Sequence, residues 1–214
     1  CWFAENCRYR PSVSPSPSSE GNTTAPFYYV YGYEGTDVAA AMSTSNYETY
    51  GVLYNWPAVM TEDICPSGWH IPSDGEWQTM EISLGMSESE AGDTGWRGTD
   101  EGDKIKSTYG WCCDGNSTNP SGFKGLPGGE FYSEFGFMNN TAGAIWRTHT
   151  TWTYPDTESC YNDVGSETEC PSDESLLRLV SATNDWVLRD QYLQDRGFSA
   201  RCVQDYIDEC GVPN

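Results

Sequence analysis

The sequence predicts an α+β domain with helices early in the chain, followed by short strands under long loops that disulfides hold together. Helical spacing is clear between residues 73 and 93. After Trp96 the chain is dominated by Gly, Asn, Ser and Pro, which separate short aromatic or β-branched runs of the kind that form strands. Nine cysteines in 214 residues are typical of compartments in which disulfides persist.

Two helices are predicted. The first begins at Ser73, which is expected to form a capping box with Glu76. The serine hydroxyl accepts a hydrogen bond from the Glu76 amide, and the Glu76 carboxylate accepts one from the Ser73 amide. An apolar stripe follows at spacings of three and four: Trp77, Met80 and Leu84. The second helix, Ser87–Asp93, begins with the same chemistry, because its serine precedes Glu90 by three residues.

Aromatic and β-branched runs predict strands at Phe27–Val30, Gly143–Thr151 and Trp186–Leu188. Residues 11–26 are rich in Pro, Ser and Thr and poor in apolar residues, so we expect an extended surface loop there. The same composition is typical of O-glycosylated stalks. N-glycosylation sequons in polar settings begin at Asn22, Asn116 and Asn139, which are acceptors if the host is eukaryotic.

The chain is strongly acidic, since 32 Asp and Glu against 11 Lys and Arg give a formal net charge of -21. Nucleic acids and anionic membrane surfaces require a basic face, so both are excluded as partners. No stretch approaches the ~20 apolar residues of a membrane span, and direct membrane insertion is therefore excluded as well. Several of the few basic residues are expected to be internal ion-pair partners: Arg97, Lys104, Lys106 and Arg201.

An odd number of cysteines leaves a free thiol, an intermolecular bridge or a partner outside the sequence. We expect the chain to be a piece of a longer polypeptide, and the alternative is one unpaired buried cysteine. Zinc is disfavoured because C-x-x-C is absent and His70 and His149 lack the spacing of a zinc site. The neighbours Cys112 and Cys113 form a vicinal disulfide or, as is more common, pair with different partners.

No catalytic residue is assigned. A nucleophile such as Cys1 or Cys202 needs a base within hydrogen-bonding reach, and only two histidines are present. His70, beside Trp69, is expected to be packed and hydrogen-bonded, whereas His149 lies in an alternating stretch and is expected on a strand surface. We therefore predict that the chain is not an enzyme.

Two sets of residues are candidates for ligand contacts. Asp114, Asn116 and Asn119 place oxygen atoms at intervals along one loop, which favours Ca²⁺, although the bidentate glutamate of an EF-hand is missing. The alternative is an ordinary Asx-turn loop. Trp152 and Tyr154 are candidates for an exposed platform on which a sugar or a partner protein stacks, with partial burial as the alternative.

Six motifs occur in order along the chain. They are C-W-F-A-E-N-C-R-Y (1–9), Y-G-V-L-Y-N-W-P-A-V (50–59), C-P-S-G-W-H-I-P-S-D-G-E-W (65–77), G-W-R-G-T-D-E-G-D-K-I-K-S (95–107), G-F-K-G-L-P-G-G (122–129) and G-F-S-A-R-C-V-Q-D (197–205). Over residues 1–205 the chain thereby resembles the Fibrobacter succinogenes major paralogous domain, a family of secreted bacterial and environmental proteins. The insertion at 11–26 and the cysteines at positions 7, 112, 113, 160 and 170 depart from the commonest pattern of that family.

The resemblance implies a C-type-lectin-like fold related to that of formylglycine-generating enzymes, with two short helices, small irregular antiparallel sheets and long loops. It also implies a disulfide between Cys65 and Cys202, which would stabilise the fold by ~3–5 kcal/mol on the loop-entropy model. Cys160 and Cys170 are expected to close a local loop. Residues 206–214 resemble the start of a Cys/Asp-rich linker of large extracellular proteins. The G-N-x-W-E-W motif of formylglycine-generating enzymes is absent.

These features together favour a non-enzymatic module for binding or assembly, extracellular or at the cell surface, with Ca²⁺ as the only cofactor considered. Its partner is expected to be a glycan, a protein or further copies of itself. The alternative is a structural subunit of a surface filament, an appendage or a virus particle, which the odd cysteine favours. An enzyme related to formylglycine generation is a third hypothesis with less support.

Overall fold

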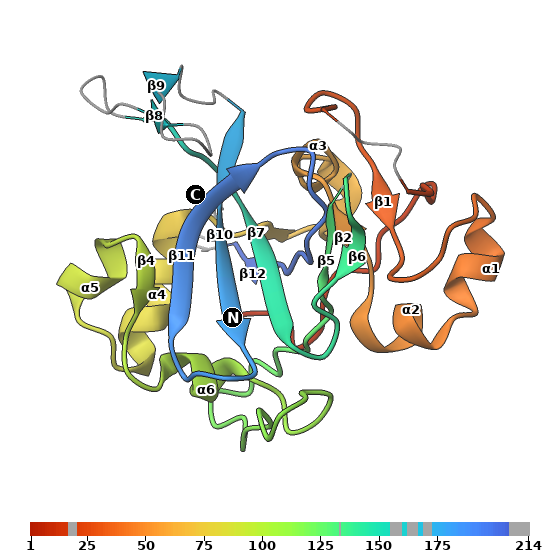
Figure 1. Ribbon diagram of the computed structural model, residues 1–214. Coiled ribbons are helices and arrows are strands. Elements are labelled where there is room, and N and C mark those ends of the chain that lie inside the picture. Colours follow the sequence, from red (N-terminus) through yellow and green to blue (C-terminus); the bar gives the residue numbers. More distant parts are fainter. Residues whose placement is uncertain (17–20, 133, 155–159, 162–166, 169–172, 206–214) are drawn as a thin grey trace.

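A four-stranded antiparallel sheet forms the centre of the structure, with the strand order β4–β11–β10–β7 (Figure 1). Its strands are β4 (Gly95–Arg97), β7 (Gly143–Thr151), β10 (Glu174–Ser181) and β11 (Val187–Leu193). The structure is a computed structural model that describes residues 1–16, 21–132, 134–154 and 173–205, with the backbone alone of two strands at 160–161 and 167–168. The predicted strand Gly143–Thr151 is confirmed, and the predicted strand 186–188 is the beginning of the longer β11.

Two-stranded antiparallel ladders accompany the central sheet, as expected for small irregular sheets. They are β1 (Tyr28–Tyr29) with β2 (Leu53–Tyr54), β3 (Trp69–His70) with β12 (Val203–Gln204), β5 (Glu130–Tyr132) with β6 (Gly136–Met138), and β8 (Cys160–Tyr161) with β9 (Glu167–Thr168). The strand predicted at 27–30 is therefore shorter than expected. The described part of the 11–26 insertion contains neither helix nor strand, in agreement with a loop.

Both predicted helices are present as α4 (Asp74–Leu84) and α5 (Glu88–Gly92), each with its capping box formed. The prediction of two helices was too low, because the described residues also form α1 (Val38–Met42), α2 (Ser45–Tyr50), α3 (Trp56–Val59), α6 (Glu101–Ile105) and a 3₁₀ turn at Glu62–Ile64. These helices are too short for an apolar period to show. Side chains cap three of them, from Asp37, Thr44 and Asn55. Among the described residues no helix has the length and apolar character to cross a bilayer.

Cys65 and Cys202 form a disulfide, the pair implied by the family resemblance, with 5.9 Å between their Cα atoms. It joins the residue after the 3₁₀ turn to the residue before β12. Within the described residues Cys1, Cys7, Cys112 and Cys113 are free, so the neighbours Cys112 and Cys113 are not bonded to each other although their sulfurs lie 3.1 Å apart. The pairing expected for Cys160 and Cys170 lies outside the described side chains.

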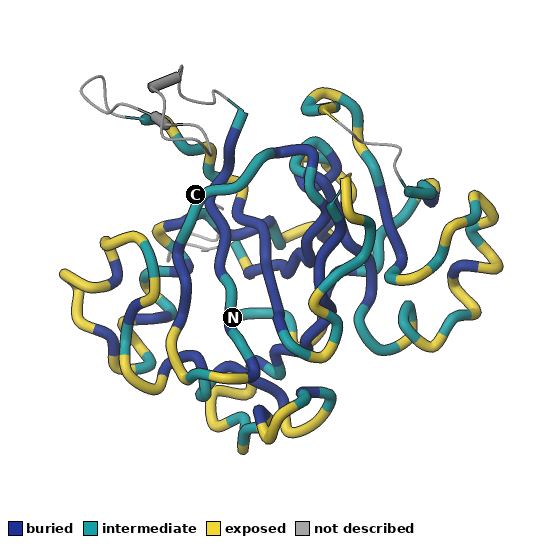
Figure 2. The backbone as a smooth tube through the Cα atoms, viewed as in Figure 1, coloured by how far each residue is buried: buried dark blue, intermediate teal, exposed yellow. Residues whose placement is uncertain are grey.

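The interior consists of buried clusters that follow the sheet and the ladders (Figure 2). One is built around Trp77 of α4, whose ring centroid lies 5.8 Å from that of Trp146 on β7 and 5.6 Å from that of Phe123. Another contains Tyr28, Tyr54 and the disulfide. Because indole and phenol rings each bury a large apolar area, these clusters supply much of the hydrophobic stabilisation in a fold with long loops.

Five buried charges join α4 to the central sheet. Glu81 accepts hydrogen bonds from Arg97 of β4 at 3.0 and 3.1 Å and from Arg178 of β10 at 2.6 Å. Asp74 binds Arg189 of β11 at 2.8 and 2.9 Å, and Arg178 at 2.8 Å. Burial alone would raise the pKa of the Asp74 carboxyl, but the hydrogen bonds and charges of Arg189 and Arg178 hold that pKa below its ordinary value. Both carboxylates are therefore neutralised where water cannot reach them.

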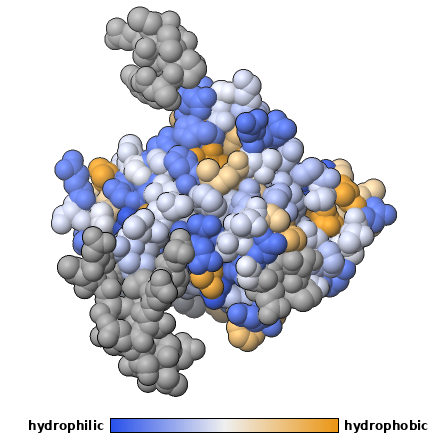
Figure 3. All heavy atoms as spheres, turned by 90° about the horizontal axis from the view of Figure 1, so that it is seen from above, coloured by the Kyte–Doolittle hydropathy of each residue, from blue (hydrophilic) through white to orange (hydrophobic). Residues whose placement is uncertain are grey.

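The basic side chains point inward. Six of them are buried, namely Arg97, Lys106, Arg147, Arg178, Arg189 and Arg201. Of the four residues predicted to pair internally, Arg97 forms a buried ion pair with Glu81, whereas Lys104 and Lys106 pair with the exposed carboxylates of Asp100 and Asp185. Arg201 differs, because it donates to Asn6 Oδ1 at 2.8 Å and to the carbonyl of Phe123. Seen from above, hydrophilic side chains cover most of the visible face, with small apolar patches between them (Figure 3).

Replacing Glu81 by Gln should destabilise the fold by about 3–5 kcal/mol, because Arg97 would remain buried without its countercharge and Arg178 would keep only that of Asp74. Urea unfolding followed by tryptophan fluorescence measures this loss. The matched control is the same substitution at the exposed Glu88, which should change stability by no more than about 0.5 kcal/mol. Equal unfolding midpoints for the two variants would show that the buried network contributes little.

Candidate functional site

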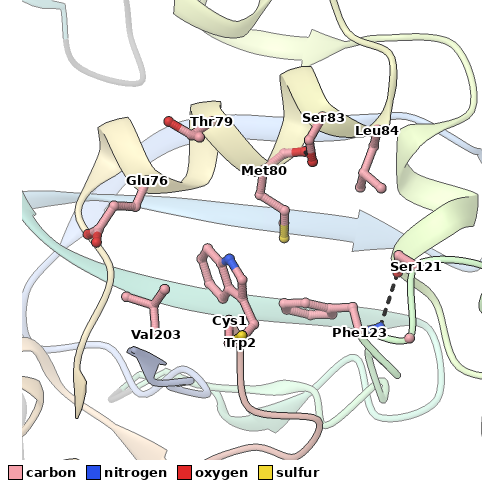
Figure 4. Close-up of a pocket in the computed structure, with 11 residues that line it drawn as sticks. Cys1, Trp2, Glu76, Thr79, Met80, Ser83, Leu84, Ser121, Phe123 and Val203 are labelled. Carbon is pink, nitrogen blue, oxygen red and sulfur yellow. Dashed lines mark hydrogen bonds between the residues drawn. The ribbon is translucent and has the colours of Figure 1, made fainter. Parts of the chain in front are cut away.

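A groove with a volume of about 480 Å³ runs along α4, between that helix, the N-terminal segment and the loop at 121–123 (Figure 4). Its apolar wall consists of Trp2, Met80, Leu84, Phe123 and Val203. Its polar lining consists of Glu76, Thr79, Ser83 and Ser121. A concave, mostly apolar surface with a few polar side chains at its edge is the usual form of a binding site for small molecules or single sugar units.

The two sides of the groove are held by different means. Helical spacing of three and four residues brings Glu76, Thr79 or Met80, and Ser83 to one side of α4. The opposite side is the N-terminal segment, which pairs with the last strand: Trp2 bridges Val203, and the Gln204 amide donates to the Cys1 carbonyl at 2.9 Å. The groove therefore brings together residues from both ends of the described chain.

Aromatic rings form the floor. The Trp2 ring packs edge-on against Trp77, 4.7 Å between centroids, and lies 5.8 Å from Phe123. Arg201 in turn lies over the Phe123 ring at 4.0 Å and donates to the Phe123 carbonyl. Because Trp77 and Arg201 are themselves fully buried, the floor is fixed in place before any ligand arrives.

The rim is rich in hydrogen-bond acceptors. Thr79 donates its hydroxyl hydrogen to the Gly75 carbonyl at 2.9 Å, and Ser83 donates to the Met80 carbonyl at 2.7 Å. Ser121 donates to the Lys104 carbonyl at 2.6 Å and accepts the Phe123 amide at 3.1 Å (Figure 4). In this arrangement each hydroxyl hydrogen is bonded to a backbone carbonyl, so the lone pairs that remain face the groove as acceptors.

Glu76 adds a carboxylate to this rim. Burial would raise the pKa of its carboxyl, but hydrogen bonds from Ser73 and His70 outweigh burial and hold that pKa below its ordinary value. The group is thus an anion and an acceptor. Together with the three hydroxyls it defines a rim suited to a ligand that brings donors, such as hydroxyl or ammonium groups, and an apolar face for the aromatic floor.

His70 is held between two carboxylates. Its Nε2 lies 2.8 Å from Glu76 Oε1, and its Nδ1 lies 2.6 Å from Asp205 Oδ1. Burial lowers the pKa of the imidazole, but both hydrogen bonds and both negative charges raise it, so the net shift is upward. Because carboxylates accept at both nitrogens, His70 is bound as the imidazolium and has no lone pair with which to act as a base. It links β3, α4 and the end of β12, and it is packed and hydrogen-bonded as the sequence predicted.

His70 also lines a second cavity of about 350 Å³, together with Cys65, Trp69 and His149. The Nδ1 of His149 lies 2.8 Å from the Ile71 carbonyl, which assigns its hydrogen to that nitrogen and leaves Nε2 as the acceptor. His149 is exposed at the end of β7, where the alternating sequence predicted a strand surface.

The residues predicted to form a stacking platform lie elsewhere. Trp152 and Tyr154 follow β7, and their rings meet edge-on at 6.2 Å. Both are half-buried: Tyr154 donates to Glu174 at 2.6 Å, and the Arg189 guanidinium lies 6.0 Å from the Trp152 ring. The structure therefore shows them in the partly buried state that was the alternative to an exposed platform.

The loop proposed for Ca²⁺ uses two of its three oxygen-bearing side chains internally. Asn116 Oδ1 accepts the Trp111 amide at 3.1 Å, and Asn119 Oδ1 accepts the Lys124 amide at 2.8 Å. Asp114 and Asn119 adopt positive φ angles of 63° and 51°. Each of these bonds spans five residues, so the two asparagine oxygens tie together the backbone of the loop and neither makes the i+2 bond of an Asx turn.

Two of the three sequon asparagines, Asn116 and Asn139, are exposed. Asn139 donates to Glu130 through its amide nitrogen, the atom that would carry a glycan. Asn22 is half-buried, and its side-chain oxygen accepts the amides of Thr24 and Ala25 at 3.1 and 2.8 Å. Asn116 is therefore the asparagine of this set whose amide nitrogen is left both exposed and without a described hydrogen bond.

Sequence reasoning missed the groove. Met80 and Leu84 were expected to be buried as part of the helix stripe, but both are half-buried because they form its wall. Trp2 belongs to the first family motif, but the sequence predicted no role for its side chain. The signal that could have found the site is the run of Glu76, Thr79 and Ser83, which lie three and four residues apart beside that stripe.

The His70 contacts should make the folded state less stable as the pH rises. The pKa of folded His70 lies above its ordinary value of 6.5, so its ion pairs stabilise fully below about pH 6.5 and are lost as the pH rises through the higher, folded value. The difference in urea midpoint between the wild type and His70→Gln should therefore shrink as the pH rises above about 6.5. His149→Gln should retain the wild-type pH dependence, and a difference that stays constant with pH would contradict the ionic role.

Comparison with known proteins gives one finding. The family model described as the Fibrobacter succinogenes major domain matches residues 1–204, which covers all six motifs almost to their end. Neither curated proteins nor solved structures gave a match. The match extends over both walls of the groove and over the disulfide, so these features lie within the domain itself.

Proposed function

The chain belongs to the Fibrobacter succinogenes major domain family, and on that premise we propose that it is a non-enzymatic extracellular binding module whose groove along α4 takes a neutral, hydroxyl-rich glycan. The observation that carries the proposal is the combination of a packed aromatic floor with a rim rich in hydrogen-bond acceptors. Sugars have the complementary construction, because one face presents C–H groups and the edges present hydroxyl donors.

In this proposal a sugar ring stacks on Trp2, which packs against the buried Phe123, while its hydroxyls donate to Thr79, Ser83 and Glu76. The net charge of -21 and the inward-pointing basic side chains disfavour anionic glycans by long-range repulsion. A ligand with ammonium groups, such as an amino sugar or a basic peptide, satisfies the same rim. The neutral glycan is preferred because the floor offers the Trp2 ring, and the described lining of the groove holds only one carboxylate.

The extracellular location and a C-type-lectin-like arrangement of the sheets and helices are part of the same proposal. The disulfide between Cys65 and Cys202 supports an oxidising compartment. The central antiparallel sheet with short helices and long loops supports the fold. Ca²⁺ is retained as an accessory cation without an assigned site, since the acidic exterior would gain from a countercharge.

A second candidate is assembly with further copies of the chain, as a structural subunit of a filament, an appendage or a particle. Two exposed free thiols, at Cys1 and Cys113, favour it because they are available for bonds between chains. A non-reducing gel of the purified protein distinguishes the two candidates. Covalent multimers that disappear in a Cys1→Ser, Cys113→Ser double variant would support assembly, and monomers alone would count against it.

The glycan proposal predicts that an array of neutral and anionic glycans retains the protein on neutral ones. Trp2→Ala should weaken binding to the retained glycan by about tenfold, equivalent to about 1.4 kcal/mol, because the stacking surface is removed. Ser83→Ala, which removes one acceptor without disturbing the aromatic packing, should weaken it as well. Both are measured by isothermal titration with and without Ca²⁺.

The matched control is Trp186→Ala. Trp186 is 48 % exposed and does not line the groove, so its removal should leave glycan affinity unchanged. Preferential retention on anionic glycans would contradict the proposed rim chemistry. Loss of binding in Trp186→Ala but not in Trp2→Ala would move the site away from the groove.

A further inference from the structure

Three cysteine sulfurs meet in the interior, although only two of them are bonded. The sulfurs of Cys7, Cys65 and Cys202 all lie within 4.8 Å of one another, and all three residues are buried. The Cys7 sulfur lies 3.4 Å from the Cys202 sulfur, which places a free thiol in van der Waals contact with the disulfide. Thiols exchange with disulfides by direct attack on one of the two sulfurs, and this contact brings the attacking and the attacked sulfur within reach, so that only a rotation of the Cys7 side chain is needed to align them.

The backbone holds Cys7 in this position. The Cys7 amide donates to the Ala200 carbonyl at 2.8 Å, and the Cys7 carbonyl accepts the Val52 amide at 3.2 Å. The segment before it follows the same strand, since the Phe3 amide donates to the Cys202 carbonyl at 3.0 Å. Cys7 therefore faces Cys202 as a result of the pairing between the N-terminal segment and the last strand.

We propose that Cys7 can replace Cys65 as the disulfide partner of Cys202, which frees Cys65 as a thiol in the second cavity. The Cys7 sulfur gives up its proton and attacks the Cys202 sulfur, so that a Cys7–Cys202 bond forms while the Cys202–Cys65 bond breaks. Cys65 leaves as a thiolate and takes up the proton. One disulfide and one thiol are present before and after, and no external oxidant or reductant is consumed.

The product differs from the starting state in which thiol can be reached. Cys7 is 5 % exposed and lines none of the described cavities, whereas Cys65 lines the cavity that also contains Trp69, His70 and His149. Freed Cys65 is therefore a modification site for small electrophiles and for small disulfides. A small disulfide would transfer one half to Cys65 and release the other half as a thiol.

The exchange is expected to be slow. Burial raises the pKa of the Cys7 thiol to about 12, although the charge of Arg201 acts against this rise. Only the thiolate attacks a disulfide, so the reacting form of Cys7 is scarce at neutral pH. The Cys65–Cys202 form therefore persists, and the exchanged form accumulates only when the freed Cys65 is captured.

Capture by iodoacetamide without any reductant tests this directly. The native protein is incubated with the reagent and digested, and the labelled and disulfide-linked peptides are identified by mass spectrometry. We expect label on Cys65 together with Cys7–Cys202-linked peptides. In a Cys7→Ser variant, label on Cys65 should fall by about tenfold or more, because the attacking thiol is missing. Cys1 and Cys113, which are exposed, should be labelled equally in both proteins and serve as internal controls.

A second variant keeps the test decisive. In Cys65→Ser, purified under oxidising conditions, Cys7 and Cys202 should form a disulfide of their own, and neither should react with iodoacetamide. The proposal is overturned if Cys7 and Cys202 remain free thiols in this variant. It is also overturned if the wild type is labelled on Cys7 with Cys65–Cys202 intact, since Cys7 would then react by exposure and not by exchange.

Discussion

Asp74 and Glu81 fix helix α4 on the central sheet, because their carboxylates meet three arginines from three different strands. Arg178 contacts both carboxylates, so the network determines the position of the helix along its axis as well as its distance from the sheet. A shift of α4 by one turn would leave buried charges unpaired, at a cost of several kcal/mol. The side of α4 that remains free of this network is the side that carries Glu76, Thr79 and Ser83, and the groove exists where it does for that reason.

The position of the groove and the chemistry of the disulfide share a second constraint, the pairing of the N-terminal segment with the last strand. That pairing places Trp2 beside α4 and Cys7 beside Cys202. Contacts between residues this far apart in sequence are costly to form, because a long loop must close first. Once formed, they place a tryptophan that lines the groove and a thiol that contacts the disulfide in one short segment of the chain.

The elements α4, α5 and β7 could be predicted because their signals lie in neighbouring residues: a capping box at the start of each helix, and a run of aromatic and β-branched residues along the strand. The short helices before residue 60 were not predicted. Helices of four to six residues are too short to show a periodic spacing of apolar residues, and they depend on single N-caps such as Asp37. The family motifs implied the Cys65–Cys202 bond. The spacing of Glu76, Thr79 and Ser83 marks only the helical side of the groove, because the remaining lining residues, 1–2, 121–123 and 203, are brought beside α4 only by the tertiary fold. The burial of Glu81 also depends on contacts with residues distant in sequence, so the residues around it did not predict that this acidic side chain is buried.

The inward orientation of the basic side chains has a consequence for proteolysis. Six of the 11 Lys and Arg residues are buried and the remaining five are half-buried, and none falls in the segments outside the described residues. Trypsin-like proteases cleave after Lys or Arg and need an extended, accessible segment around the cleavage site. The fold therefore protects the six buried cleavage sites, and digestion at those sites must wait for local or global opening of the chain.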